Sequence, residues 1–143
     1  MSIQSVSGLQ VYMGTNAAST QAEFEALTMV NIHYVESVSD FGDSFNPIIF
    51  QGMQGRSKHL KGSVDGGDFS LNYALCSTCL GQFYLMLYAL AQPPRPFKIV
   101  FSGGEIRYFM GHIYSVKESL PNADSILMVS ASIGINGPII RVT

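Results

Sequence analysis

The sequence predicts a mainly β fold with one α-helix, in which about six to eight strands form a sandwich or barrel and the helix packs on its side. Three observations lead to this. Short segments carry apolar residues at alternate positions, turns rich in Gly and Asp separate them, and a single run has helical spacing. Strands punctuated by turns around one helix are typical of a closed or sandwiched sheet.

The chain has 143 residues, 47% of them hydrophobic, which is enough for a substantial core. We therefore expect a single domain over residues 1–143. Charged residues make up only 13%, while there are 7 Tyr, 9 Phe and 7 Met, a composition typical of surfaces that contact partners. A large β core without partners would explain the same composition.

Charge and hydropathy exclude several classes of protein. A net charge of -2 with 8 Lys and Arg argues against a protein that grips nucleic acid. The longest apolar segment, residues 83–91, is far below the roughly 20 residues that cross a bilayer, so we expect no membrane partner. The first eight residues lack a basic or long apolar run, so no signal peptide is predicted and a cytoplasmic site of synthesis is expected.

The N-terminal part predicts two strands and one ambiguous segment. Residues 9–13 alternate and form the first strand. Residues 15–26 indicate a loop, with a single helical turn as the alternative, since Thr20 and Glu23 fit a capping box. Residues 29–38 alternate again and form the second strand.

Residues 39–59 form a connection far longer than the median of about 4 to 6 residues. The segment contains apolar side chains that a solvated loop would hardly keep, so it is not disordered by composition. Two alternatives remain, a loop that folds back over its own core and a loop that is covered by another molecule.

The turn at residues 65–67, in which Gly66 and Gly67 indicate a hairpin turn, introduces a strand over residues 68–75 with one dry face and one wet face. Phe69, Leu71, Tyr73 and Leu75 share the dry face, whereas Asp68, Ser70 and Asn72 share the wet face. We expect the dry face to contact the core.

An apolar helix is predicted to begin near Ser77 or Thr78, either of which is a suitable cap, and to end before Pro93. Its predicted core stripe is Leu80, Phe83, Tyr84, Leu87 and Leu90. Because residues 78–91 carry no charge, the opposite face is apolar too, and a helix that is apolar all round is buried. We expect a neighbouring subunit to cover that face, through Leu85, Met86 and Ala89.

Three further strands and two turns are predicted after the helix. Residues 97–101 and 105–117 form strands joined by a hairpin turn at Gly103 and Gly104. A turn at residues 121–124 leads to the last strand, residues 127–136, in which apolar residues alternate with Ser and Asn.

The order of strand, helix, Pro stop, strand and Gly turn over residues 69–104 resembles the middle of the major tail tube proteins of long-tailed bacteriophages. Residues 60–62 match the Leu-x-Gly of that family, and residues 65–68 match its Asp/Gly turn. Residues 131–139 resemble its closing strand with Gly-Pro. The order and spacing of these motifs over nearly the whole chain carry the resemblance.

The resemblance implies a structural protein, not an enzyme, that forms hexameric rings stacked into a tube for DNA ejection. Implied partners are other copies of the chain and tape measure, tail terminator and baseplate-type proteins, with DNA passing through the lumen without specific binding. The expected location is the virion tail, assembled in the host cytoplasm. A type VI secretion tube is a close variant, and a β-barrel that binds a small apolar ligand is the alternative from another class.

The resemblance also implies that the long connection reaches neighbouring subunits or rings. The residues concerned are Phe41, Phe45, Ile48, Ile49, Phe50, Met53, Arg56 and Lys58. A tube must confine DNA without holding it, so a basic lining is unsuitable. Asp68, Ser70 and Asn72 are therefore the candidate channel-lining residues.

Little in the sequence indicates chemistry. Cys76 and Cys79 have the spacing of a redox dithiol or half a zinc site, but a zinc site needs two more ligands and the three His stand apart. Two ordinary buried thiols are predicted. Asp65 and Asp68 read as solvated turn residues. No nucleophile or phosphate motif is present, so we expect no catalytic residue, metal or cofactor.

Overall fold

The computed structural model describes residues 3, 7–120 and 122–142, which form a mainly β protein as the sequence predicts. These residues contain nine strands and two helices. Neither helix is long and apolar enough to span a membrane. The elements in order are β1 (Gln10–Met13), α1 (Gln21–Ala26), β2 (Val30–Ile32), β3 (Val35–Val38), β4 (Ser44–Gln51), β5 (Ser57–Asp65), β6 (Asp68–Ala74), α2 (Leu80–Tyr88), β7 (Arg95–Val100), β8 (Ile106–Ser119) and β9 (Met128–Val142).

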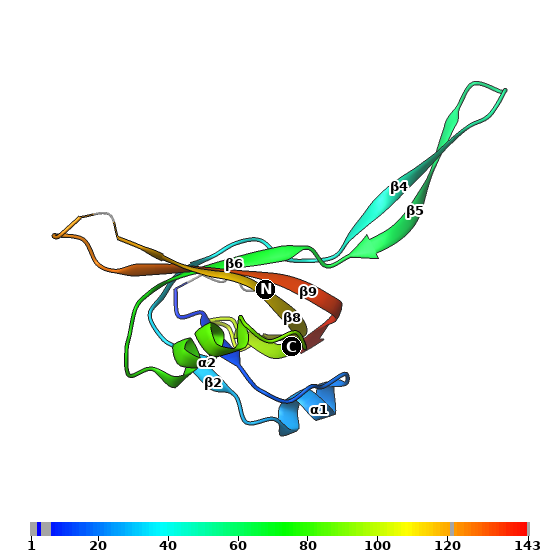
Figure 1. Ribbon diagram of the computed structural model, residues 1–143. Helices are drawn as coiled ribbons and strands as arrows, with labels where there is room; N and C mark the ends of the chain where they lie inside the picture. The colour runs from blue at the N-terminus through cyan, green and yellow to red at the C-terminus, as the bar shows by residue number, and fades with distance from the viewer. Residues whose placement is uncertain (1–2, 4–6, 121, 143) are drawn as a thin grey trace.

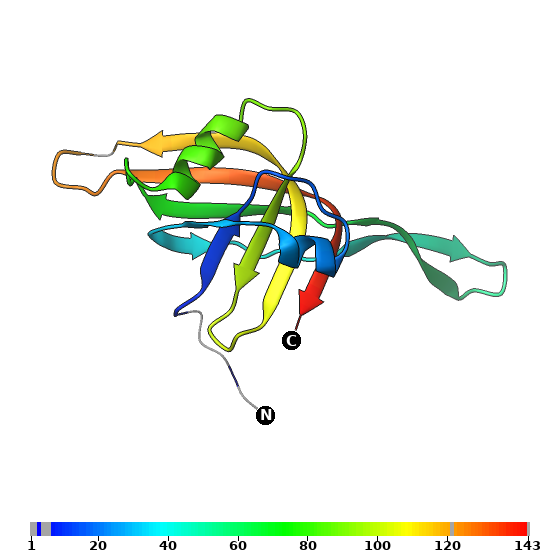
Figure 2. The same cartoon turned by 90° about the horizontal axis from the view of Figure 1, so that it is seen from below.

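Seven strands form one antiparallel sheet in the order β2-β1-β7-β8-β9-β6-β3. β2 and β3 lie at opposite ends of this order, yet only His33 and Tyr34 separate them in the chain. The sheet must therefore curl until its two edges approach each other at this corner (Figures 1 and 2). Tyr34 has φ 62°, in the left-handed region that tight turns use. The predicted second strand is thus two strands joined by a sharp turn.

The concave side of the sheet holds the main core. Phe69, Phe97 and Phe109 are fully buried, with ring centroids of Phe69 and Phe109 5.2 Å apart and those of Phe97 and Phe109 5.6 Å apart. The predicted dry face of β6 is confirmed for Phe69, Leu71 and Tyr73, whereas Leu75 lies beyond the end of the strand and is 37% exposed. The dry face of β9 is confirmed as well, since Ala131 is buried there with its alternate neighbours. Burying each Phe contributes about 1.5–3 kcal/mol.

Helix α1 covers a second, smaller core on the other side of the sheet. The capping box fixes its start, because the Thr20 side chain accepts a hydrogen bond from the Glu23 amide at 3.3 Å. Phe24 then stacks on Tyr108 with ring centroids 5.1 Å apart. The alternative of a helical turn in this segment, which the sequence left open, is therefore the one observed.

The turns agree with their prediction at two places and differ at one. Gly104, with φ 93°, closes the β7–β8 hairpin, where the Phe101 amide donates to the Glu105 carbonyl at 2.8 Å. Asn122 Oδ1 accepts from the Asp124 amide at 3.1 Å in the turn before β9; Pro121 of that predicted turn lies outside the described residues. Gly66 and Gly67, predicted as a hairpin turn, instead join strands of two different sheets.

Candidate functional site

The stretch predicted as a long loop forms a β-hairpin, β4–β5, which we call the arm. Its strands pair only with each other and project away from the main sheet (Figures 1 and 2). The register places Ile48 opposite Leu60 and Phe50 opposite Lys58. Pro47 and the glycines obscured this pattern in the sequence. The useful signal was two runs rich in strand-forming residues around a Gly-containing turn.

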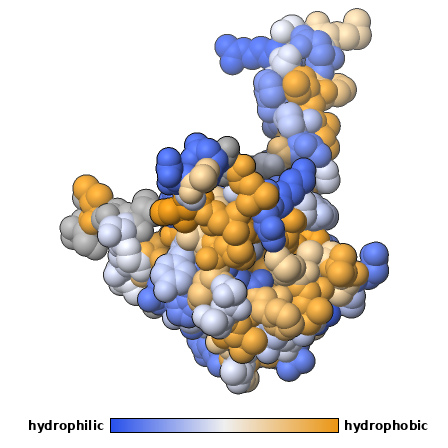
Figure 3. All heavy atoms as spheres, turned by 60° about the vertical axis from the view of Figure 1, so that its left-hand side comes forward, coloured by the Kyte–Doolittle hydropathy of each residue, from blue (hydrophilic) through white to orange (hydrophobic). Residues whose placement is uncertain are grey.

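Both faces of the arm carry exposed apolar side chains. Paired residues share a face, so Phe45 and Val64 lie on one face while Ile48 and Leu60 lie on the other. All four are exposed, as is Phe50. A two-stranded hairpin alone is marginally stable in water. The described part of the chain leaves the apolar faces of the arm uncovered (Figure 3).

The remaining predicted arm residues divide into two groups. Ile49, Met53, Arg56 and Lys58 are exposed, with Met53 at the tip at 106%. Phe41 is different, because it lies before β4 and packs partly buried against the core, its ring centroid 6.1 Å from that of Phe69. The prediction that Phe41 also meets another subunit stays a prediction, because its side chain is only partly buried. It anchors the base of the arm to the body of the same chain.

The helix α2 turns a different face inward from the one predicted. Its buried residues are Gly81, Gln82 and Leu85, whereas Phe83 is 57% exposed and Met86 44% exposed. The prediction of Leu85 as an interface residue is wrong, since it is fully buried, and Ala89 packs partly against the same core. The exposed apolar side chains of α2 and its end, here called the α2 face, are Leu80, Phe83, Met86, Leu87 and Leu90.

Hydrogen bonds and close packing select the inward face of α2. Gln82, only 4% exposed, donates to the carbonyls of His33 at 2.8 Å and Ala74 at 3.0 Å, and accepts from the Cys76 amide at 2.8 Å. A side chain on Gly81 would collide with the Asn31 carbonyl. The helix can therefore approach β2 closely only along this side, which apolar periodicity alone did not reveal.

The predicted wet residues lie on a polar surface that spans β3, β6, β9 and β8, which we call the polar face. Asn72 lies opposite Ser130 and donates to Ser37 Oγ at 2.9 Å. Ser70 lies opposite Ser132. Asp68 occupies the exposed start of β6. The neighbouring strand β8 adds Ser115 and Lys117 opposite the two serines of β9, residues that the sequence reading did not connect with this surface.

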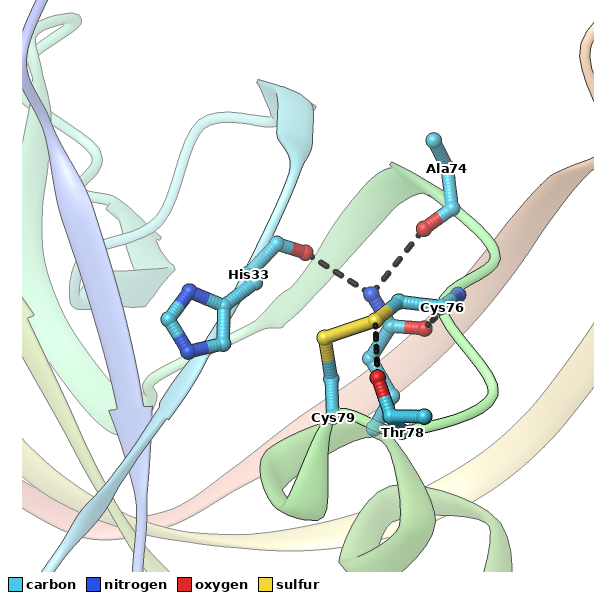
Figure 4. The surroundings of a disulfide bond; sticks show 6 residues. His33, Ala74, Cys76, Thr78 and Cys79 are labelled. Atoms are coloured by element: carbon cyan, nitrogen blue, oxygen red, sulfur yellow. Dashed lines mark hydrogen bonds between the residues drawn. A yellow bond between two sulfur atoms is a disulfide. The ribbon is translucent and has the colours of Figure 1, made fainter.

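Cys76 and Cys79 form a disulfide in the turn between β6 and α2 (Figure 4). The prediction of two buried thiols is therefore wrong. Both residues are only partly buried, because the turn runs over the surface, and their Cα atoms lie 5.4 Å apart, within the range for a bond. Cys79 is also the N-cap of α2, in place of the predicted Ser77 or Thr78.

The electrostatics of the described residues are mild. Burial, followed by the charge of Glu118, raises the pKa of Tyr73 to about 12, and burial also raises the pKa of Tyr108. No group of three or more His, Cys, Asp or Glu in the described part of the chain is placed to hold a metal ion.

Comparison with known proteins gives matches among solved structures. No protein-family model and no curated protein sequence matches the chain. A chain in the sheath/tube terminator of PVC, an extracellular contractile injection system, superposes with a TM-score of 0.74 at 12% identity over 100% of this chain and 99% of that chain. The SPP1 tail tube gives 0.66 at 13% identity, over 93% and 75% of the two chains.

A chain from the tail of the GTA particle gives a TM-score of 0.69 at 10% identity over 99% of this chain and 100% of that chain. The chain has the tail tube fold. At such low sequence identity, structural similarity shows a shared fold and no more. The resemblance drawn from the sequence is therefore confirmed for the fold. Within this tail tube fold, the arm, the α2 face and the polar face are three separate surfaces.

Proposed function

We propose that the chain is a structural subunit that forms hexameric rings, which stack into the tail tube of a phage particle and conduct DNA at ejection. One observation carries this proposal. A chain with the tail tube fold exposes two apolar surfaces, the arm and the α2 face, that its own described residues leave uncovered. Monomeric soluble proteins rarely keep such patches, whereas assembling proteins need them.

The arm supports contacts between subunits because of its shape as well as its composition. It extends beyond the body of the chain, so its apolar faces can lie against other copies of the subunit. Because both faces are apolar, the arm fits between two surfaces better than against one. Phe45, Ile48, Ile49, Phe50 and Met53 supply the apolar contact, and Arg56 and Lys58 meet acidic groups of the neighbour.

The α2 face gives each subunit a second contact surface. Leu80, Phe83, Met86, Leu87 and Leu90 carry no charge, so association removes apolar area from water without desolvating an ion. Two apolar surfaces on one subunit allow head-to-tail contacts that close into a ring or continue as a stack.

The polar face is proposed to line the channel. Its serines and Asn72 are short and uncharged, and the charges of Asp68 and Lys117 are opposite in sign, so the surface offers little attraction to phosphates. Asp68, Ser70 and Asn72 are thus retained as lining residues. The tape measure, tail terminator and baseplate-type partners, the virion tail location and assembly in the host cytoplasm belong to the same proposal.

Assembly of the purified chain tests the proposal. We expect rings or tubes in negative-stain images and a sedimentation rate that rises with protein concentration. A variant in which a short Gly-Ser bridge replaces residues 44–65 should fold, because the arm pairs only with itself and closing a loop costs only about 0.6 kcal/mol per doubling of length. That variant should form no tubes.

Two results would contradict this function. A wild-type chain that stays monomeric at all concentrations would exclude a tube subunit, and normal tubes from the armless variant would exclude the role of the arm. The exposed Gln54→Ala at the arm tip is the matched control and should assemble normally.

Two other functions were considered from the sequence, and each can be distinguished from a phage tail tube. A barrel that binds a small apolar ligand needs an internal cavity, whereas Phe69, Phe97 and Phe109 fill this interior. The other is a type VI secretion tube, and the likeness to the PVC chain adds the tube of an extracellular contractile injection system as a related candidate. Particles that contain DNA would identify a phage tail, and particles without DNA would identify an injection or secretion tube.

A further inference from the structure

The Cys76–Cys79 disulfide has no part in the contacts proposed above, yet it lies at a decisive position in the fold. Cys76 donates its amide to Gln82 Oε1 at 2.8 Å, and the same Gln82 holds the carbonyls of His33 and Ala74. Cys79 begins α2 as its N-cap. The bond therefore joins the end of the sheet, the buried Gln82 and the start of the helix into one unit (Figure 4).

The disulfide also borders the α2 face. A surface hollow next to it is lined by Tyr73, Cys76, Cys79, Phe83 and Met86. Two of these, Phe83 and Met86, belong to the α2 face. A change in the turn that carries the cysteines will therefore alter the surface that the helix presents to a neighbouring subunit.

We propose that Cys76 and Cys79 form a thiol–disulfide exchange site that stiffens the α2 face when it is oxidised. Its effect on tubes rests on the function proposed above. The dithiol form assembles, and the disulfide form gives a tube that resists heat and denaturant better. The partial exposure of both residues gives small thiols and disulfides access to the sulfur atoms in the free subunit.

The oxidant is a small-molecule disulfide such as glutathione disulfide. The thiolate of one cysteine attacks a sulfur of the oxidant, and one small thiol leaves. The second cysteine then attacks the mixed disulfide, so the Sγ–Sγ bond forms and the second small thiol leaves. The chain loses two electrons and two protons, and the oxidant gains them. In a reducing compartment the dithiol persists, and in an oxidising medium the disulfide persists.

The bond should raise stability for two reasons. It removes freedom of the turn from the unfolded chain, an effect that is small for so short a loop. It also keeps the Cys76 amide aligned on Gln82, so α2 is held against the β2–β3 corner before a neighbour binds. Association then costs less conformational entropy, because α2 is already ordered.

The experiment compares full-length chain reduced with tris(2-carboxyethyl)phosphine and chain oxidised with glutathione disulfide. Mass spectrometry checks that the oxidised chain is lighter by two hydrogen atoms. We expect the oxidised subunit to unfold at a temperature higher by about 3–8 °C. Tubes from oxidised subunits should dissociate in urea at least about threefold more slowly than tubes from reduced subunits.

The double variant Cys76→Ser with Cys79→Ser is the control and should behave as reduced wild type in both buffers. Equal unfolding temperatures and equal dissociation rates for verified dithiol and disulfide forms would overturn the proposal while leaving the tube function intact. If neither form assembles, the tube function fails, and the unfolding temperatures still decide whether the site exists. Should the double variant not fold, the two forms of wild type give the same comparison.

Discussion

At the scale of single residues, Gln82 is the most informative side chain. It is the only buried polar side chain among the described residues, and its amide uses both hydrogens and its oxygen on backbone groups of three segments. A buried polar group is tolerated only when it is fully bonded. Gln82 therefore fixes the inward face of α2, although its neighbours in sequence are apolar.

The first prediction concerns this residue. Gln82→Leu keeps a similar volume but leaves the His33 and Ala74 carbonyls and the Cys76 amide without their partner. We expect the free energy of unfolding, measured with urea, to fall by about 2–4 kcal/mol. Gln92→Leu, at an exposed position, is the control and should change it by less than about 0.5 kcal/mol. A small effect at position 82 would show that α2 is held by apolar contacts alone.

The second prediction is a pH dependence that arises from Tyr73. Burial raises its pKa from 10.0 to about 12, so the unfolded chain loses the phenol proton at lower pH than the folded chain. The stabilisation linked to this shift is complete below pH 10 and is lost as the pH rises from 10 to about 12. Unfolding temperatures measured from pH 8 to pH 12 should fall most steeply in that window.

The comparison for this prediction is Tyr73→Phe. The substitution should reduce the slope of unfolding temperature against pH between pH 10 and pH 12. Part of the slope should remain, because burial also raises the pKa of Tyr108. Identical slopes for wild type and Tyr73→Phe would contradict the assignment.

At the scale of elements, α2 and the arm show how the same composition serves opposite purposes. Both are apolar, but α2 buries one side against the chain's own sheet and exposes the other, whereas the arm exposes both faces. Leu85 is buried in the core, whereas Met86 is exposed on the face proposed to meet a neighbouring subunit. Adjacent residues on one helix consequently have different roles.

The third prediction separates those roles. Leu85→Ala opens a cavity in the core and should lower the free energy of unfolding of the subunit by about 2–5 kcal/mol. Met86→Glu places a charge on the α2 face and should change subunit stability by less than about 1 kcal/mol while abolishing tubes. Unfolding and negative-stain images would be recorded for both. Normal tubes from Met86→Glu would show that the α2 face lies outside the assembly interface.

At the scale of the whole molecule, the curled sheet separates its surfaces by chemistry. The concave side is filled by aromatic and aliphatic side chains, and the convex side of β3, β6, β9 and β8 carries small polar groups. Because strand alternation puts successive residues on opposite sides, one strand such as β6 contributes to both. The polar face is therefore a property of four strands together.

The fourth prediction tests whether that face lines the channel. Changing Asp68 and Asn72 together to Lys should leave tubes intact, because both positions are exposed. DNA release should slow, since the new cations bind phosphates at every ring, and the defect should weaken as salt rises. Release kinetics at low and high salt provide the measurement. Release at the wild-type rate in low salt would place these residues outside the channel.

Much of the fold could be predicted because its signals are local. Alternation identified β6 and β9, Gly104 marked the β7–β8 hairpin, and Thr20 with Glu23 kept a helical turn open as the alternative to a loop where α1 forms. The sequence analysis predicted a long connection where the arm forms a hairpin. Pro47 interrupts the strand pattern of β4, and exposed apolar strands are rare without a partner. Its need for cover was nevertheless predicted from composition.

The sequence by itself determined the fold class, the faces of the strands and the presence of uncovered apolar segments, since each depends on residue type and period. Only the tertiary structure decided which side of α2 is buried, that Phe41 packs against the core of its own chain, and that Cys76 and Cys79 are bonded. A helix that is apolar on all sides has no preferred inward face until particular partners are in place. Here the carbonyls of His33 and Ala74 and the close approach at Gly81 made that choice.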